Sequence, residues 1–182
     1  MLEGKKIIVT GSASGMGEAT LKAYVKAGAN VIGMDISDQK GKDISSNVNN
    51  IGPGKCSFIH IDVSDKDSVK NAFDLALDEL KTLDVLAHPA AIQGPADASD
   101  VKVEDWDNMF AVNVRGTMLT NQTAFKYMKK NGSGSIINFG SISGLRPEPS
   151  ASAYSAAKGA VHSWTRTAAG TWGKYNIRVN AI

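Results

Sequence analysis

The chain has little of what marks secreted, membrane-spanning or nucleic-acid-binding proteins. Its 182 residues include one cysteine, Cys56, so an internal disulfide is excluded and a buried core thiol is expected. No apolar run could span a bilayer, no signal peptide is recognisable, and the net charge is only +2. No His, Cys, Asp and Glu cluster has metal-ligand spacing. These absences predict a cytoplasmic protein that uses no metal, no membrane and no nucleic acid.

What is present is a regular alternation of strand and helix patterns. Short runs rich in β-branched residues predict strands at 6–10, 30–35, 56–62, 83–87, 134–140 and 176–181. Helix patterns cover 15–28, 64–80, 103–130 and 152–173, with a weaker one at 38–50. This alternation predicts a single α/β domain over 1–182: a Rossmann-like, doubly wound parallel sheet with helices on both faces. Ligands of such sheets bind beyond the carboxyl ends of the strands.

A glycine-rich loop joins the first predicted strand directly to a helix. Glycines let the chain turn tightly and approach a pyrophosphate, and the helix start offers unpaired N–H groups. Strand, glycine loop and helix in this order predict a dinucleotide site, and an ordinary glycine-rich turn is the weaker alternative. The loop residues expected to contact the dinucleotide are Gly11, Ser14, Gly15, Met16 and Gly17.

The second predicted strand ends at Asp35, roughly twenty residues past the glycine loop. A carboxylate there can accept hydrogen bonds from the adenosine ribose hydroxyls, and it repels the additional phosphate of NADP. The alternative is an aspartate that only caps a helix or a loop. We therefore predict NAD rather than NADP as the cofactor.

The third pattern is Ser141 followed by Tyr154 and Lys158. Tyrosine and lysine four residues apart share one face of a helix. Free tyrosine has a pKa of about 10 and is a poor acid or base near neutrality, but a cation one turn away stabilises its phenolate. A serine hydroxyl can hydrogen-bond a carbonyl oxygen during reduction. The three residues therefore predict proton transfer to a carbonyl or from an alcohol.

Together these motifs resemble the short-chain dehydrogenase/reductase family, in its single-domain branch, over nearly the whole chain. The resemblance further implies a catalytic asparagine, and a pair of residues that contacts the adenine. The matches are Thr10 to Gly17 for the Thr-Gly-x-x-x-Gly-x-Gly loop, Asp62-Val63, Asn113, Ser141, and Tyr154 with Lys158 for the Tyr-x-x-x-Lys motif.

The resemblance implies an NAD(H)-dependent oxidoreductase that interconverts a secondary alcohol and a ketone by hydride transfer. Tyr154 is then the general acid/base, Lys158 assists it and holds the nicotinamide ribose, Ser141 polarises the carbonyl oxygen, and Asn113 holds a relaying water. Two alternatives stay open: a carrier-linked 3-oxoacyl reductase using NADPH, and a non-catalytic dinucleotide-binding module. A homodimer or homotetramer through the two long helices is also implied.

Two departures from the family pattern stand out. His88-Pro89-Ala90-Ala91 replaces Asn-Asn-Ala-Gly after the fourth strand, where Ala90 is expected at the cofactor. Family members also continue beyond the sixth strand, so we expect a fold truncated before the last strand and a longer natural polypeptide. The strand at 176–181, expected to be buried on both faces, would form a sheet edge, and residues 1–182 alone are expected to be inactive. His162 is expected at the surface or an interface.

Overall fold

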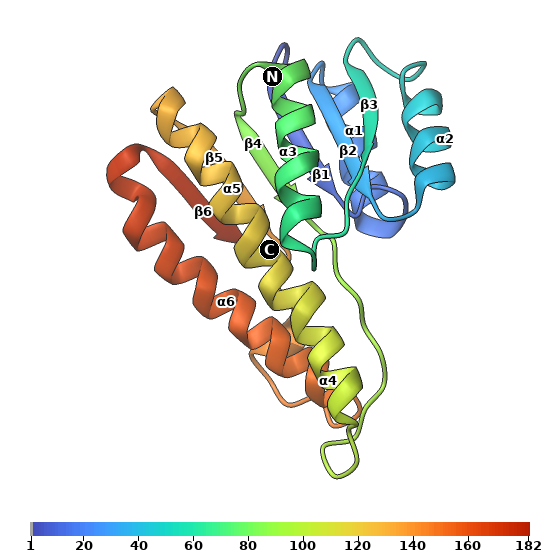
Figure 1. Cartoon of the computed structure of the whole chain (residues 1–182), viewed down its shortest axis with the longest axis vertical. Coiled ribbons are helices and arrows are strands. Elements are labelled where there is room, and N and C mark those ends of the chain that lie inside the picture. Colours follow the sequence, from blue (N-terminus) through green and yellow to red (C-terminus); the bar gives the residue numbers. More distant parts are fainter. Residues whose placement is uncertain (1) are drawn as a thin grey trace.

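The computed structural model describes residues 2–182 and contains a six-stranded parallel sheet in the order β3-β2-β1-β4-β5-β6 (Figure 1). Helices pack on both faces, so the predicted doubly wound fold is confirmed. The strands are β1 (Lys6–Thr10), β2 (Asn30–Asp35), β3 (Lys55–His60), β4 (Val85–His88), β5 (Gly134–Asn138) and β6 (Ile177–Ala181). The helices are α1 (Gly15–Lys26), α2 (Asp38–Val48), α3 (Lys66–Leu80), α4 (Val103–Phe110), α5 (Gly116–Asn131) and α6 (Ser152–Trp172).

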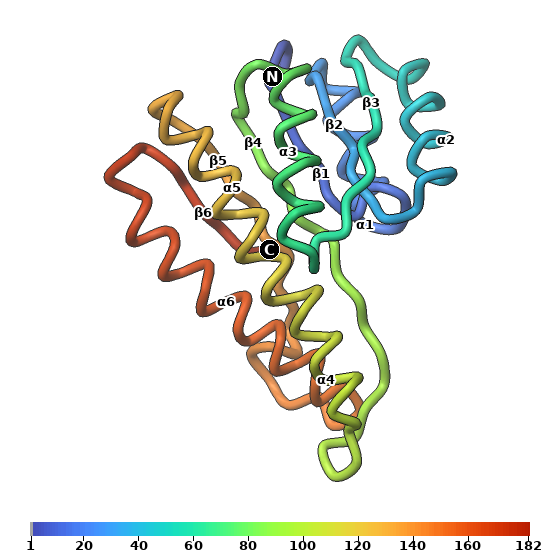
Figure 2. Tube along the Cα trace, viewed as in Figure 1, coloured from blue at the N-terminus to red at the C-terminus, as the bar shows by residue number. Residues whose placement is uncertain are grey.

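Successive side chains of a buried strand point to opposite faces of the sheet, so the apolar residues form one core on each face. In β1, Ile7 and Val9 pack with α1 and α2, whereas Ile8 packs with α3, α5 and α6. Because both faces are covered, the strand sequences are continuous apolar runs rather than alternating ones. Figure 2 follows the chain as it winds outward from β1 in both directions.

The strand boundaries differ from the sequence prediction at the carboxyl ends. β3 ends at His60 rather than at residue 62, and β5 ends at Asn138 rather than at residue 140. β4 is shifted to Val85–His88 from the predicted 83–87. The residues left beyond the strands form the loops in which ligands of such a sheet bind, and apolar periodicity does not distinguish a strand end from the start of a loop.

The long helix predicted at 103–130 is interrupted. A π-helical turn at Ala111–Arg115, labelled η1, separates α4 from α5. Such turns often occur at functional sites, and here the turn contains Asn113. The hydrophobic period does not reveal it, because one wider turn leaves the apolar face almost unchanged.

A lobe extends past the carboxyl ends of the strands (Figure 1). It is formed by α4, the loop before it and the start of α6. Two main-chain hydrogen bonds close it, from Ala96 N to Ser150 O at 3.0 Å and from Ser152 N to Ala96 O at 3.0 Å. They join the loop after β4 to the loop after β5.

Strand β6 lies at the edge of the sheet, as predicted, but it is not buried on both faces. Ile177 and Val179 are buried, whereas Arg178 and Asn180 are exposed. The expectation of a strand covered on both sides was wrong, because helix α6 packs on only one face of β6 in the described residues. Among residues 2–182, no helix combines the length and apolar character needed to cross a bilayer.

Candidate active site

The glycine loop is shaped by two close approaches of the main chain. A Cβ on Gly11 would lie 2.8 Å from main-chain atoms of Ala90, and Gly11 also has a φ of +59°. A Cβ on Gly17 would collide with the carbonyl oxygen of Gly11. Glycine is therefore required at both positions, and the tight turn directs the start of α1 toward the carboxyl end of the sheet.

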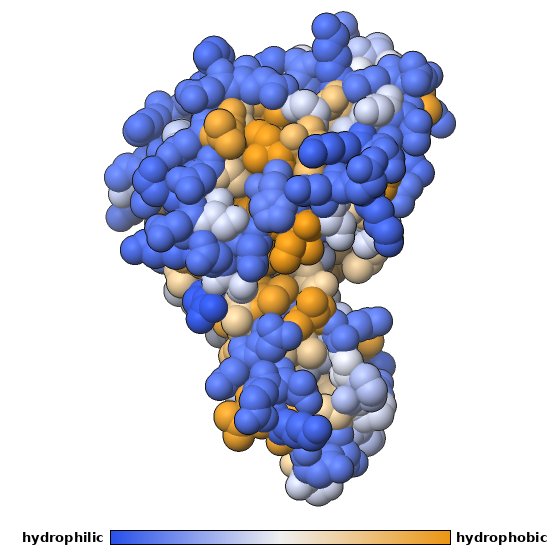
Figure 3. All heavy atoms as spheres, turned by 45° about the vertical axis from the view of Figure 1, so that its right-hand side comes forward, coloured by the Kyte–Doolittle hydropathy of each residue, from blue (hydrophilic) through white to orange (hydrophobic). Residues whose placement is uncertain are grey.

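A cleft of about 480 Å³ runs along this end of the sheet. It brings together every residue that the sequence predicted for the dinucleotide. These residues are Gly11, Ser14, Gly15, Met16, Gly17, Asp35, Asp62, Val63, Ala90, Tyr154 and Lys158. Glycines that admit a close backbone approach, a helix start and two carboxylates suit a dinucleotide. Figure 3 shows apolar side chains where the molecule narrows between its main body and the lobe.

The two carboxylates are held in place by main-chain donors. Asp35 accepts hydrogen bonds from Ala13 N at 3.0 Å and from Ser37 N at 2.9 Å, so it braces the glycine loop and the turn before α2. Asp62 accepts from Ser64 N at 2.9 Å and from Ser64 Oγ at 2.7 Å. Asp35 therefore braces a loop, as the alternative interpretation predicted, and it also lines the cleft.

Tyr154 lies where the cleft meets a second groove of about 510 Å³. The groove is lined by Ser141 and Ile142 on one loop and by Gln93 and Pro95 on another. The Ser141 hydroxyl lies 2.8 Å from the Ser143 hydroxyl and also accepts a hydrogen bond from Ser143 N, so its position is fixed. A substrate in the groove would meet the Ser141 and Tyr154 side chains at the edge of the dinucleotide cleft.

Lys158 is almost fully buried, with 4% of its surface exposed. Its ammonium group donates a hydrogen bond to Phe139 O at 2.6 Å, and burial lowers its pKa to about 8. Burial disfavours the charged form of the amine. The group is thus a cation near neutral pH that is poorly screened by solvent, which strengthens its effect on nearby atoms.

Asn113 braces a loop. Its side-chain oxygen accepts from Ile92 N at 2.8 Å, and its amide donates to Ile92 O at 2.8 Å and to Met109 Sδ at 3.0 Å. Its own carbonyl accepts from Thr117 Oγ1 at 2.7 Å. The side chain therefore holds the chain entering the lobe. A relaying water at Asn113 stays a prediction.

Two histidines near the site were not assigned to it by sequence reasoning. His162, expected at the surface or an interface, is half-buried, and its Nε2 lies 3.0 Å from Ser141 O. Its spacing of four from Lys158 places it on the same helical face and could have indicated this. His88 is buried at the end of β4, beside the cleft residues Pro89 and Ala90.

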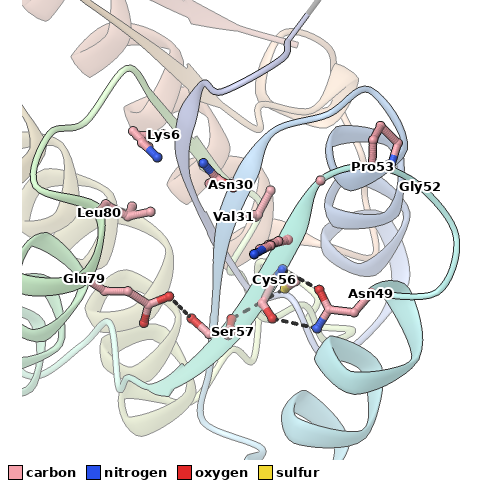
Figure 4. A pocket seen from close by; sticks show the side chains of 12 residues that line it. Lys6, Asn30, Val31, Asn49, Gly52, Pro53, Cys56, Ser57, Glu79 and Leu80 are labelled. Atoms are coloured by element: carbon pink, nitrogen blue, oxygen red, sulfur yellow. Dashed lines mark hydrogen bonds between the residues drawn. The ribbon is translucent and has the colours of Figure 1, made fainter.

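Another cavity, of about 530 Å³, lies at the opposite, amino end of the strands (Figure 4). Three of its polar side chains are hydrogen-bonded: Ser57 Oγ donates to Glu79 at 2.8 Å, and the Asn49 side chain pairs with the main chain of Cys56. Cys56 is buried, as expected, and burial raises the pKa of its thiol. We assign no function to this cavity.

Comparison with known proteins identifies the class to which this fold and site belong. The family model described as short chain dehydrogenase matches residues 5–182. The chain therefore belongs to the short-chain dehydrogenase/reductase family. It is an oxidoreductase that acts on CH–OH groups with a nicotinamide dinucleotide as redox partner, and not the non-catalytic module considered above.

Several curated proteins are similar along the whole chain. The 3-oxoacyl-[acyl-carrier-protein] reductase FabG of Thermotoga maritima is 35% identical over 100% of this chain and 73% of its own length. Cyclopentanol dehydrogenase of Comamonas sp. is 35% identical over 98% of this chain and 71% of its own length. A solved short chain dehydrogenase from Mycobacterium smegmatis superposes with a TM-score of 0.95 at 28% identity, covering 99% of this chain and 76% of that one.

Proposed function

We propose that the protein is an NAD(H)-dependent oxidoreductase that interconverts a secondary alcohol and a ketone. The proposal rests on one observation above all: Tyr154 lines both the dinucleotide cleft and the open groove. A ligand in each would meet at this side chain. The bound nicotinamide supplies or accepts the hydride, and the protein supplies position and electrostatics.

The neighbouring side chains suit the accompanying proton transfer. In reduction, the Tyr154 hydroxyl gives its proton to the carbonyl oxygen as hydride reaches the carbon, and in oxidation the phenolate takes the alcohol proton back. The Lys158 cation stabilises the phenolate, and the Ser141 hydroxyl donates a hydrogen bond to the substrate oxygen. Reduction leaves Tyr154 as a phenolate beside the Lys158 cation, and a proton taken up from solvent then restores the hydroxyl.

The preference for NAD is argued from charge. The charged residues lining the cleft are Asp35, Asp62 and Lys158. Lys158 lies at the Tyr154 end, so Asp35 is not offset by a cationic side chain of the cleft lining. A 2′-phosphate about 4 Å from the Asp35 carboxylate would be repelled by roughly 4 kcal/mol per unit charge near a protein surface. This favours the unphosphorylated ribose.

A carrier-linked 3-oxoacyl reductase is the second candidate, favoured by the similarity to the Thermotoga enzyme. The charge of the lobe opposes it. Residues 97–107, which belong to the lobe, carry five carboxylates and one lysine, and Glu148 lines the groove itself. Such a surface repels a carrier arm that bears a phosphate, whereas it is indifferent to an uncharged alcohol. The apolar side chains of Ile142 and Leu145, both 64% exposed, favour a hydrophobic substrate.

The test uses the natural polypeptide with NAD and NADP in separate assays. Cyclopentanol, cyclohexanol and their ketones are compared with an acetoacetyl thioester by following the absorbance of the reduced cofactor. We expect turnover of the cyclic substrates with NAD(H). Turnover of the thioester alone with NADPH would select the carrier-linked reductase, and binding of NADH without any turnover would contradict the proposal.

We also propose that two copies associate through α5 and α6. A groove of about 530 Å³ formed by α4, η1, α5 and α6 is lined by apolar side chains including Phe110, Val114, Met118 and Trp164. Burial against a second copy would remove this apolar surface from water. Sedimentation of the wild type and of Met118→Glu tests this. The wild type is expected to be oligomeric and the variant to dissociate, and a monomeric wild type would refute the proposal.

A further inference from the structure

A buried row of polar side chains crosses the sheet directly beneath the dinucleotide cleft. Val9 of β1 pairs with Ala87 of β4, which places the next residues, Thr10 and His88, side by side. His88 pairs in turn with Asn138 of β5. Thr10 and Asn138 are fully buried, and His88 is 2% exposed.

The row replaces the apolar core at one level of the sheet. Two residues earlier, on the same face of each strand, stand Ile8, Leu86 and Ile136, all in the large apolar core. A buried polar side chain costs stability unless it is hydrogen-bonded, so three in a row need partners. Helix α5 supplies partners for two of them: Thr120 Oγ1 lies 3.3 Å from His88 Nδ1, and the Asn121 amide exchanges two hydrogen bonds with that of Asn138.

A buried side-chain contact between His88 and Thr10 joins β4 to the start of the glycine loop. His88 Nδ1 and Thr10 Oγ1 lie 2.8 Å apart and share a hydrogen bond. Pro89 follows His88 and has no N–H to donate. The next donor, Ala90 N, reaches Thr10 Oγ1 only at 3.4 Å. Of these two partners of the Thr10 hydroxyl, the imidazole is the closer.

Thr10 leads directly into Gly11, whose main chain packs against Ala90. Movement of Thr10 would shift both the glycine loop and the Ala90 wall of the cleft. The two ring nitrogens of His88 differ in their hydrogen-bond partners. Nδ1 makes the contact with Thr10, whereas Nε2 is buried without a partner.

We propose that His88 is a positioning residue for the dinucleotide: its Nδ1 fixes Thr10, and through it the glycine loop, against β4 and α5. The inference rests on the proposed function of the cleft. It also gives a role to His88, a residue that departs from the family pattern. His88 lines neither the dinucleotide cleft nor the open groove. Its loss is expected to weaken cofactor binding more than it slows the chemical step.

The test exploits the difference between the two ring nitrogens. The side-chain amide of Asn reaches the position of Nδ1, whereas that of Gln reaches toward the position of Nε2. NADH binding to the natural polypeptide is measured by fluorescence titration for the wild type, His88→Ala, His88→Asn and His88→Gln, with thermal unfolding recorded in parallel. We expect His88→Ala to raise the Kd about tenfold, the effect of losing one hydrogen bond. His88→Asn should restore most of the affinity, and His88→Gln should not.

Steady-state kinetics should show the same order in the KM for NAD, with kcat changed less. A double-mutant cycle with Thr10→Val should give strong non-additivity, because either change breaks the same contact. Equal NADH affinity in wild type and His88→Ala would overturn the inference, as would equal affinity of the Asn and Gln variants. If the wild type itself bound no dinucleotide, the proposed function would fail first, which is a distinct result.

Discussion

The Lys158 ammonium nitrogen lies 5.5 Å from the centre of the Tyr154 ring while it donates a hydrogen bond to the carbonyl of Phe139. The lysine is thus anchored to the end of β5, and the tyrosine one turn earlier on α6 is exposed to its charge. Because the cation is buried, its field at the ring is screened less than that of a surface lysine. This arrangement supports the acid/base role that we propose for Tyr154.

Replacement of Tyr154 by phenylalanine removes only a hydroxyl. Turnover is expected to fall by about 10² to 10⁴, the usual contribution of general acid/base catalysis. NADH affinity and the thermal midpoint should stay close to those of the wild type, since the ring and its packing are kept. Stopped-flow measurement of hydride transfer checks this, and a variant that retained most of its rate would show the proton-transfer assignment to be wrong.

Lys158 should make stability depend on pH in the alkaline range. Its pKa in the folded protein is about 8, against an ordinary value of 10.5 for a lysine. Between these values the unfolded chain binds more protons, so stability rises with pH across this window, by at most about 1.4 kcal/mol per pH unit. Urea unfolding at several pH values from 7.5 to 10.5 measures the slope. The slope should be smaller for Lys158→Met than for the wild type. Identical slopes would contradict the assignment of a buried cation.

His88 should make the stability of the fold depend on pH in the acidic range. Burial and the nearby Lys158 charge lower its pKa from 6.5 to about 3. Below pH 6.5 the unfolded chain takes up a proton that the folded protein excludes, so stability falls as the pH decreases toward 3. His88→Asn removes this titration and should lose less stability between pH 6.5 and 4.5. Urea unfolding at several acidic pH values measures this difference. If the free energies of unfolding of the wild type and the variant changed in parallel with pH, a neutral, buried imidazole would be contradicted.

Asp35 should control the choice between the two nicotinamide dinucleotides. Asp35→Ser removes the negative charge but keeps a hydrogen-bonding group near Ala13. The ratio of kcat/KM for NAD over NADP is expected to fall at least about tenfold, which corresponds to roughly 1.4 kcal/mol of relieved repulsion. Asp67→Ser, a carboxylate in the first turn of α3, serves as the control with the same charge change. An unchanged ratio in Asp35→Ser would remove the basis for the NAD preference.

Two glycines test the geometry of the loop. Gly17→Ala would place a methyl group against the Gly11 carbonyl and is expected to destabilise the fold by about 1–3 kcal/mol and to abolish NADH binding. Gly170→Ala adds a methyl group on α6 with no atom within 4 Å and should stabilise by about 0.4–1 kcal/mol. Thermal unfolding of both variants provides the comparison. A tolerated Gly17→Ala would show that the loop is looser than its packing indicates.

Sequence alone determined the features that depend on neighbours along the chain. The apolar runs marked the six strands, the glycine loop marked the turn after β1, and the spacing of four put Tyr154 and Lys158 on one helical face. These are local properties, because a strand or a helix repeats every few residues and its pattern can be read directly. Convergence at the carboxyl ends then followed from the parallel order of the strands.

Tertiary structure decided which distant residues meet. Thr10 and His88 are 78 residues apart in the chain, and only the register of β1 against β4 sets them side by side. The brace between Asn113 and Ile92, and the contact of His162 with Ser141, likewise arise from packing between elements. Buried polar groups must find partners wherever the fold brings donors and acceptors together, and no period in the sequence records where that is. For this reason the sequence pattern revealed the face of α6 that we propose to be catalytic, and the fold alone revealed the polar row beneath the cleft.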